Sequence, residues 1–311
     1  MVNCKECLKA FETDKEFNSH LKSHSLRQAE YYQKYEPRYD LFDSSIIRFK
    51  NKEQYLSTDF NSRLNLKKWL EKVSKEESLA YCKKFLAQRK EKKNLIYTPT
   101  QVELRSMMSP PIHSLNNLFE GYYEECEKMG FKNKYLYPKG QMIYGFAYGN
   151  DYKIYVDTRE QKPLPFKRQT EIKTLKFGDY SFSDHEATCN CYVERKALGD
   201  FIGTLSGGYD RFCREIERAQ EAKANLIILV EESLENCLRF NSLPQVYKKK
   251  TRITPDYVFH NVRNIIQKYP FVQFLFVKNR DEASEMIEKL FTCGCGYEKI
   301  DLQLSYDLKL L

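Results

Sequence analysis

The hydrophobic and polar positions along the chain predict a mostly helical first half and a second half in which strands and helices alternate. Residues 26–95 are predicted to be mainly helical, most clearly over 76–93, where helix-forming residues run on without glycine or proline. A further helix is predicted over 115–129, followed by a connection over 132–150 that is rich in tyrosine, glycine and lysine. From Tyr152 onward, short strand-like runs alternate with helical stretches, which predicts an α/β domain with helices packed on a sheet.

The elements of the second half follow from this alternation. The predicted strands are 153–156, 172–176, 190–196, 226–231 and 272–277, and the predicted helices are 201–223, 254–269 and 281–291. The apolar run at 226–231 is typical of a strand that is buried on both faces. Because the pattern changes near residue 150 and the chain starts with a cysteine- and histidine-containing segment, we divide it into domains 1–26, 27–150 and 151–311.

Composition indicates a globular protein without a membrane-spanning segment. Hydrophobic residues make up 41% of the chain and aromatic residues 14%, which is enough to build a core. The longest purely apolar runs are far shorter than the roughly 20 residues that a membrane span requires, and no charged-then-apolar leader follows Met1. We therefore expect an intracellular protein of a reducing compartment, the cytoplasm or nucleus, with no membrane partner and with its ten cysteines present as thiols or metal ligands.

The net charge of +8 comes mostly from the first half, where the basic excess is concentrated between residues 51 and 100. Such a stretch suits a polyanionic partner, although a solubilising helix face would have the same composition. Its candidate DNA contacts are Lys83, Lys84, Arg89 and Lys90. Other residues of this half either line a nucleic-acid groove or pack in a core, and the sequence leaves both open for Tyr31, Tyr32, Tyr35, Trp69 and Arg105.

The first 24 residues carry the spacing of a zinc finger. Two residues separate Cys4 from Cys7, three separate His20 from His24, and twelve lie between the pairs. Two cysteines at this spacing can hold a tetrahedral Zn²⁺ from one turn, and histidines four apart share one face of a helix. The motif resembles the Cys2His2 finger family, a small ββα unit that commonly binds nucleic acid. One finger reads only about three base pairs and cannot specify a site alone, so a zinc-bound finger without DNA contacts is the alternative.

A second group of chemically active residues lies where predicted strands end. Because side chains alternate along a strand, Glu194 and Lys196 share one face and Arg195 takes the other. The segment 181–189 is long enough to turn back, which would bring Asp179 beside Glu194. Two carboxylates and a lysine form a site for Mg²⁺ or Mn²⁺, which lowers the pKa of bound water, while the lysine orients that water. A surface salt-bridge cluster is the alternative.

These residues resemble the signature of a nuclease family. The GD…ERKxxxD pattern of XPF-type structure-specific endonucleases, a branch of the PD-(D/E)xK restriction-like nucleases, is similar to Gly178-Asp179 with Glu194-Arg195-Lys196-Ala197-Leu198-Gly199-Asp200. The VDxRE element of the same family is matched by Val156-Asp157-Thr158-Arg159-Glu160. The resemblance covers residues 152–292. It implies a restriction-endonuclease-like nuclease domain, a central mixed sheet with flanking helices, preceded by the ββα zinc finger and the helical region.

The resemblance also implies a role for each matching position. Asp179 and Glu194 would be the principal Mg²⁺ or Mn²⁺ ligands and Lys196 the catalytic lysine. Arg159 and Arg211 would contact phosphate or anchor neighbouring helices. The remaining catalytic positions would support the metal site or balance its charge, and these are Asp157, Glu160, Arg195 and Asp200. Further positions that resemble family features are Ser206, Glu215, Glu231 and Glu232.

The implied function is a metal-dependent DNA endonuclease that hydrolyses phosphodiester bonds at branched, flap or junction DNA in recombination, repair or replication. Many cellular members follow the nuclease with tandem helix–hairpin–helix units, for which the stretch after Phe291 leaves no room. The finger and the basic region would then provide the DNA grip, in a homodimer or with a partner subunit, as in a viral or mobile-element nuclease. Two other functions fit the residues: a non-catalytic DNA-binding or recruitment protein on a nuclease scaffold, and a restriction- or homing-like enzyme that cuts duplex at a defined sequence.

Two Cys-x-Cys pairs lie in the predicted nuclease half, Cys189 with Cys191 and Cys293 with Cys295. If the C-terminal segment folds back beside the strand that leads to Glu194, the four thiolates could hold a second, structural zinc. Buried free thiols are the alternative.

Overall fold

The computed structural model describes residues 2–49, 55, 58–139, 152–184, 187–188, 190–247 and 252–311. The chain divides into two compact units, one formed by Met1–Tyr81 with Met108–Pro110 and the other by Cys82–Met107 with Pro111–Leu311. The division falls within helix α5, Lys75–Lys93, so the basic C-terminal half of this helix belongs to the second unit. The domain limits at residues 26 and 150 stay predictions, since compactness does not show that a segment folds on its own.

The first unit begins with a ββα arrangement. Strand β1, Val2–Asn3, pairs antiparallel with β2, Ala10–Phe11, and helix α1 spans Asp14–Leu21. A capping box starts α1, because the Thr13 hydroxyl accepts from the Glu16 amide and the Glu16 carboxylate accepts from the Thr13 amide. This is the local fold that the cysteine and histidine spacing predicts.

Aromatic packing continues the first unit beyond the finger. Helix α2, Gln28–Tyr35, brings Tyr31 against Phe17 of α1, with ring centroids 5.0 Å apart in an edge-on arrangement. Tyr31 and Tyr32 are only 2% and 3% exposed, so these tyrosines belong to a core and not to a nucleic-acid groove. Helix α4, Arg63–Lys72, follows and is capped by the Ser62 hydroxyl.

Short helices open the second unit and differ from the sequence prediction. The single helix expected over 115–129 is wrong, because the chain forms α7 and α8 there. Glu120 takes a left-handed φ of 65° at the end of α7, and Gly121 follows. The helices of this region are α6 Gln101–Arg105, α7 Ile112–Phe119 and α8 Tyr122–Lys128.

A mixed sheet forms the centre of the second unit. Its strand order is β4-β3-β5-β7-β8-β9, with β6 paired to β5. The pairs β3-β5 and β5-β7 are antiparallel, whereas β4-β3, β7-β8 and β8-β9 are parallel. The strands are β3 Ile154–Asp157, β4 Thr170–Lys173, β5 Tyr180–Asp184, β6 Ala187–Thr188, β7 Cys191–Lys196, β8 Asn225–Val230 and β9 Val272–Phe276.

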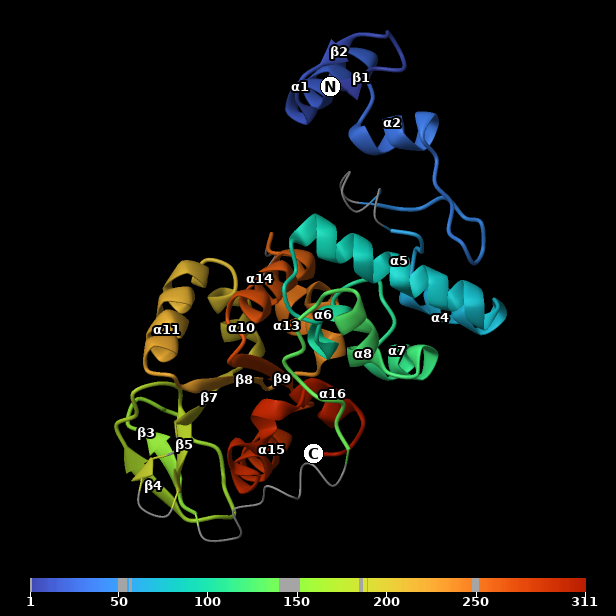
Figure 1. Ribbon diagram of the computed structural model, residues 1–311. Helices are drawn as coiled ribbons and strands as arrows, with labels where there is room; N and C mark the ends of the chain where they lie inside the picture. Colours follow the sequence, from blue (N-terminus) through green and yellow to red (C-terminus); the bar gives the residue numbers. More distant parts are fainter. Residues whose placement is uncertain are drawn as a thin grey trace. The chain divides into compact units, whose positions relative to one another are not determined.

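Helices cover both faces of this sheet (Figure 1). Ile228 of β8 belongs to the core under α10, α11 and α14, and Leu229 to the core under α15 and α16. Burial on both faces explains why the sequence of β8 is an uninterrupted apolar run. The helices after β7 are α10 Leu198–Thr204, α11 Tyr209–Glu221, α12 Leu234–Cys237, α13 Pro244–Tyr247, α14 Pro255–Lys268, α15 Arg280–Thr292 and α16 Leu302–Asp307. No helix within the described ranges is long and apolar enough to cross a membrane.

The continuous helix predicted over 201–223 is also wrong, because it is broken between α10 and α11. Gly207 and Gly208 lie in the break, where glycine disfavours a continuing helix. The hydroxyl of Ser206 donates to the Ile202 carbonyl oxygen at 2.6 Å and so satisfies one of the last carbonyl groups of α10. Helix α11 therefore starts afresh with Tyr209.

Candidate active site

The pairing of β5 with β7 brings the two predicted metal ligands onto neighbouring strands. The Asp179 amide donates to the Val193 carbonyl oxygen at 2.8 Å. In return, the Arg195 amide donates to the Asp179 carboxylate, also at 2.8 Å. Asp179 therefore lies beside the position of Glu194 on β7, in the arrangement that the hairpin reading of the sequence predicts.

Gly178 makes this close pairing possible. Its φ of +60° lies in the left-handed region, and a Cβ at this position would lie 2.8 Å from the Val193 carbonyl oxygen. Any other residue would have to push the two strands apart. The glycine of the Gly-Asp pair is therefore required by the backbone, and the position of Asp179 depends on it.

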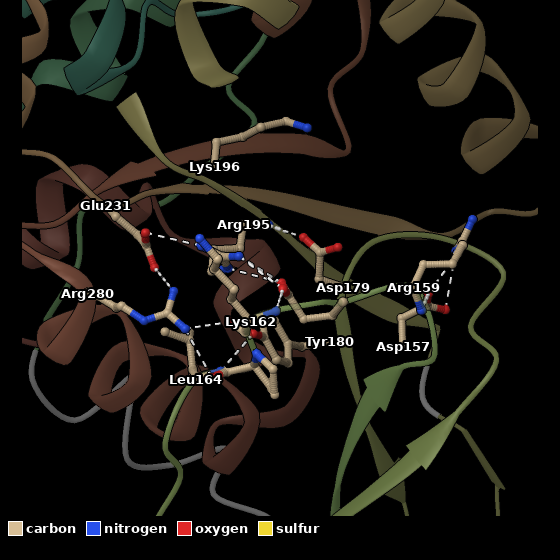
Figure 2. Close-up of polar contacts among 12 residues, drawn as sticks. Asp157, Arg159, Lys162, Leu164, Asp179, Tyr180, Arg195, Lys196, Glu231 and Arg280 are labelled. Atoms are coloured by element: carbon tan, nitrogen blue, oxygen red, sulfur yellow. Dashed lines mark hydrogen bonds and ion pairs between the residues drawn. The ribbon is translucent and has the colours of Figure 1, made fainter. Parts of the chain in front are cut away.

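Glu194 and Lys196 extend from the same face of β7. The Lys196 ammonium lies 2.5 Å from a Glu194 carboxylate oxygen, and the two side chains are 15% and 22% exposed. The same ammonium lies 5.5 Å from the centre of the Phe212 ring, which belongs to the first turns of α11. Arg195 extends to the other side of the strand (Figure 2). The lysine is thus held between a carboxylate and an aromatic ring at the edge of solvent.

A cleft of about 380 Å³ collects most of the predicted site residues. Six of the seven positions predicted to be catalytic contribute to its wall, and Asp157 does not. The residues that line the cleft are Arg159, Glu160, Gln161, Lys162, Asp179, Glu194, Arg195, Lys196 and Asp200. Segments that are far apart in the sequence therefore meet in one polar cleft.

The Glu194 carboxylate disfavours a negative charge on its neighbour Asp179. Burial, together with the nearby Glu194 carboxylate, raises the pKa of Asp179 to about 7, against the opposing hydrogen bond from the Arg195 amide. A carboxyl group whose pKa is raised by a neighbouring carboxylate is stabilised when either a proton or a cation binds there. Mg²⁺ commonly takes one or two carboxylates and completes its shell with water and phosphate oxygens. Asp179 and Glu194 therefore fit a hard divalent cation.

Asp157 is held in a different way. Its side chain is 1% exposed and accepts hydrogen bonds from the Arg159 guanidinium at 2.6 Å and from the Leu175 amide at 2.7 Å. Burial alone would raise the pKa of Asp157, but these hydrogen bonds outweigh it and lower the pKa. The carboxylate thus stays ionised and ties the end of β3 to the segment that follows β4.

A chain of alternating charges lies behind β7. The Arg195 guanidinium donates to both oxygens of Glu160 and pairs with Glu231 at 3.1 Å. Arg280, the first residue of α15, pairs with the other oxygen of Glu231 at 3.1 Å and donates to the carbonyl oxygens of residues 162–163. Figure 2 shows Glu231 with dashed contacts to both arginines. The loop that carries Glu160 is therefore anchored to β7, β8 and α15.

Among the charged residues behind β7, Arg280 is the one that the sequence did not predict. The sequence marks Glu231 only as the end of a strand with a family resemblance, and nothing in the neighbourhood of Arg280 indicates that it belongs to a site. Its contacts join α15 to a loop more than 100 positions earlier. These contacts exist only in the folded chain, so no local sequence pattern could indicate them.

The segment that forms the cleft is similar to a known domain family. Residues 156–290 match the ERCC4 domain. The match begins in β3 and ends in α15, so it includes the whole cleft and Arg280, while the finger lies outside it. It supports an XPF-type nuclease domain, and with the mixed sheet it confirms the predicted restriction-endonuclease-like fold.

Two solved structures are similar to part of the chain. XPF from Aeropyrum pernix in complex with DNA is 23% identical, with a TM-score of 0.33, over 44% of this chain and 61% of that one. A second structure of XPF from Aeropyrum pernix is 22% identical, with a TM-score of 0.32, over 43% of this chain and 62% of that one. The chain thus spans about three fifths of the length of these structures. No curated protein matches it.

The two arginines predicted to contact phosphate within the ERCC4 domain differ in position. Arg159 lies at the cleft with 67% of its side chain exposed, although it also pairs with Asp157. Arg211 is on the exposed side of α11, where it pairs with Glu215 one turn later at 3.8 Å. Arg159 is therefore the one of the two that lines the cleft.

The basic residues predicted on α5, outside the ERCC4 domain, also have different surroundings. Lys83 pairs with Glu125 at 2.6 Å, and Lys90 donates to the Met129 carbonyl oxygen at 2.7 Å. Lys84 is exposed. Lys83 and Lys90 are thus held by contacts within the second unit.

The four finger residues converge on one point. One ligand atom from each of Cys4, Cys7, His20 and His24 lies within 4.8 Å of all the others, and the two histidine Nε2 atoms are 3.0 Å apart. A tetrahedral Zn²⁺ with bonds of about 2.0–2.3 Å places its donor atoms about 3.3–3.8 Å apart, so small shifts of these side chains would bring the four atoms to the distances of a zinc site. Burial, His24 and Lys9 lower the pKa of His20, which favours the neutral form that binds metal. The donor set therefore fits zinc.

This cluster is the one place among the described residues where three or more histidine, cysteine or acidic side chains lie close enough to share an ion. The predicted second zinc site cannot be compared in the same way, because Cys189 and the side chain of Cys295 lie outside the described residues. Cys191 and Cys293 are buried, and the Tyr297 hydroxyl donates to the Cys191 sulfur.

Proposed function

We propose that this protein is a metal-dependent DNA endonuclease that hydrolyses a phosphodiester bond at branched or junction DNA. The observation that carries the proposal is the convergence of Asp179, Glu194 and Lys196 in one polar cleft within the segment that matches the ERCC4 domain. Acidic groups would repel a polyanionic substrate unless a cation neutralised them. A bound cation would neutralise these carboxylates and allow the DNA backbone to approach them.

Asp179 and Glu194 would hold the cation, and a Mg²⁺ or Mn²⁺ at this position would supply Lewis-acid stabilisation of the phosphate and a more acidic water. Lys196 donates to Glu194 and so fixes the direction of that carboxylate. Lys196 also lines the cleft, where its ammonium can orient the attacking water and stabilise negative charge on the phosphate. Arg159, at the exposed side of the cleft, can contact a neighbouring phosphate.

Arg195 has an electrostatic task in this proposal. Its guanidinium forms ion pairs with Glu160 and Glu231 and therefore does not contact the substrate. Both carboxylates are 10% exposed or less, so without Arg195 they would be uncompensated charges close to DNA. The arginine thus lowers the repulsion between DNA and the acidic residues behind the cleft, while Asp179 and Glu194 stay available for the cation.

The test of the proposal is cleavage of four labelled substrates: plain duplex, a splayed arm, a flap and a four-way junction. We expect the wild-type protein with Mg²⁺ to cut branched substrates and the Lys196→Ala protein to bind them without cutting. Products that appear only with plain duplex would favour the restriction- or homing-like function. Binding without products, in wild type as well as variant, would favour the scaffold function or a missing partner subunit. A matched RNA junction tests whether DNA is the substrate.

Substitution of Arg280 by alanine is expected to lower the single-turnover cleavage rate roughly tenfold. The variant loses the ion pair to Glu231 and the contacts that anchor the loop of Glu160. The residues on that side of the cleft are then held less firmly in position. The control is Lys278→Ala, because the Lys278 side chain is 75% exposed and lies on the same segment. Rates measured at saturating DNA and several Mg²⁺ concentrations decide the matter, and equal rates for the two variants would contradict the role of Arg280.

A further inference from the structure

A second groove of the second unit is lined by cations from two helices that are far apart in sequence. It has a volume of about 450 Å³ and lies between the end of α5, α6, the start of α11 and α14. Its basic side chains are Arg89 and Lys93 from α5 and Arg263 and Lys268 from α14. Residues 89 and 93 are one turn apart on the same helix face, so α5 presents both to the groove.

Contacts with neighbours orient the α14 cations. The Arg263 guanidinium donates to the hydroxyl and to the carbonyl oxygen of Ser106, at 2.9 and 3.2 Å. The Lys268 ammonium pairs with Glu217 at 3.0 Å, and its side chain remains 63% exposed. Lys93 is exposed as well. The groove therefore offers cations that are held in position and open to a ligand in water.

The acidic group in the wall of the groove does not cancel this charge. Glu103 is 1% exposed and accepts hydrogen bonds from the Gln267 side-chain amide and the Thr100 amide, both at 2.8 Å. Burial raises the pKa of Glu103, against the opposing effect of nearby Lys134. Glu217 offsets part of the Lys268 charge at the end of the groove. Four cations against these two acids leave the groove basic.

Helix α11 connects the groove to the candidate active site. Tyr209, the first residue of α11, lines the groove. Phe212, one turn later, has its ring 5.5 Å from the Lys196 ammonium. One turn of helix advances about 5.4 Å, so the groove begins close to the catalytic lysine. A DNA strand that passes Lys196 would reach the groove within a few nucleotides.

We propose that this groove binds the phosphate backbone of the DNA substrate a few nucleotides from the bond that is cut. The inference rests on the proposed function. Lysine and arginine side chains that are exposed along a groove are the usual partners of phosphate oxygens, and such contacts position the nucleic acid without reading its sequence. The sequence marks the whole basic stretch of α5, whereas the fold selects Arg89 and Lys93 from it by bringing them opposite α14.

The test compares two double variants with the same change in net charge. Lys93→Gln with Lys268→Gln removes two exposed groove cations. Lys92→Gln with Lys132→Gln removes two exposed cations of the same unit that do not line the groove. Binding is measured by fluorescence anisotropy with a labelled splayed-arm DNA, in the full-length Asp179→Asn background and at several salt concentrations. Cleavage is measured with Mg²⁺ and an intact active site, and melting temperatures verify that each variant is folded.

We expect the groove variant to bind DNA roughly tenfold more weakly, while the control changes little. A plot of the logarithm of the DNA association constant against the logarithm of the salt concentration should become less steep by about two. The KM of the groove variant should rise with kcat within about twofold, because the contacts act on binding and not on the chemical step. Equal effects of both pairs, or no effect of the groove pair, would overturn the proposal while leaving the nuclease function standing. If the wild-type protein cuts no DNA and the groove variant still binds DNA more weakly, the groove proposal is supported and the proposed nuclease function is contradicted.

Discussion

Replacement of Asp179 by asparagine is expected to abolish DNA cleavage and, without added Mg²⁺ or Mn²⁺, to raise the melting temperature of the protein. The carboxylate is partly buried beside Glu194, which is why its pKa is raised to about 7. Asparagine has the same shape, still accepts the hydrogen bond from the Arg195 amide and carries no charge. We expect cleavage to fall by roughly 10³-fold or more, because a principal ligand of the cation is lost.

The gain in stability should depend on pH in a defined direction. Between its ordinary pKa of 3.8 and its raised value of about 7, Asp179 binds more protons in the folded than in the unfolded chain. Wild-type stability therefore falls as the pH rises through this window, whereas the variant lacks this term. The melting temperature of Asp179→Asn should exceed that of wild type by a few degrees at pH 8 and by much less at pH 5.

Differential scanning fluorimetry of the zinc-bound protein without added Mg²⁺ or Mn²⁺, at pH 5 and pH 8, measures this difference. Glu171→Gln is the control, because Glu171 is an exposed acid on the edge strand β4 and should leave the melting temperature nearly unchanged. Mg²⁺ should stabilise wild type and not Asp179→Asn. A variant that is less stable than wild type at pH 8, or one that still cuts DNA, would show that Asp179 has been given the wrong role.

Removal of zinc is expected to unfold the finger and leave the mixed sheet intact. Fingers of this type depend on the ion for their fold, since so small a unit buries too little apolar surface by itself. Without zinc, Cys4 and the short helix α1 would lose their link, and the Phe17–Tyr31 packing would be exposed. We expect one zinc per chain, its loss in Cys4→Ser, and rapid proteolysis near the N-terminus of that variant.

Zinc analysis and limited proteolysis of Cys4→Ser and Cys213→Ser separate the effects of a ligand and of a half-buried thiol in the second unit. Only the first should lose zinc. A wild-type protein without zinc, or a Cys4→Ser protein with an unchanged digestion pattern, would contradict the finger. One zinc per chain that disappears in Cys4→Ser would also leave no second zinc for the two Cys-x-Cys pairs.

The convergence of the candidate catalytic groups could be predicted from the sequence, because short-range rules govern their positions. Glu194 and Lys196 share a face through the alternation of a strand, and Asp179 reaches Glu194 through a hairpin of few residues. The Gly178 position follows from the same pairing, since only glycine tolerates its backbone conformation so close to Val193. The finger is local in the same sense, with all four ligands within one short segment.

Features that depend on contacts between distant segments were missed or left open. The glycine pair at 207–208 and the left-handed Glu120 break two helices whose composition favours continuity. Tyr31 and Tyr32 proved to be core residues, which only their neighbours could decide.

The tertiary structure also decided the electrostatic surroundings of the site. Arg280 contacts Glu231 because α15 packs beside β8, and Lys93 and Lys268 line one groove because the fold brings α5 and α14 together. The sequence by itself thus determined which groups are candidates for the proposed reaction, because alternation, turns and ligand spacing act over a few residues. Which side chains support those groups and line the groove was decided only by the packing of helices on the sheet, because it joins residues that no local pattern connects.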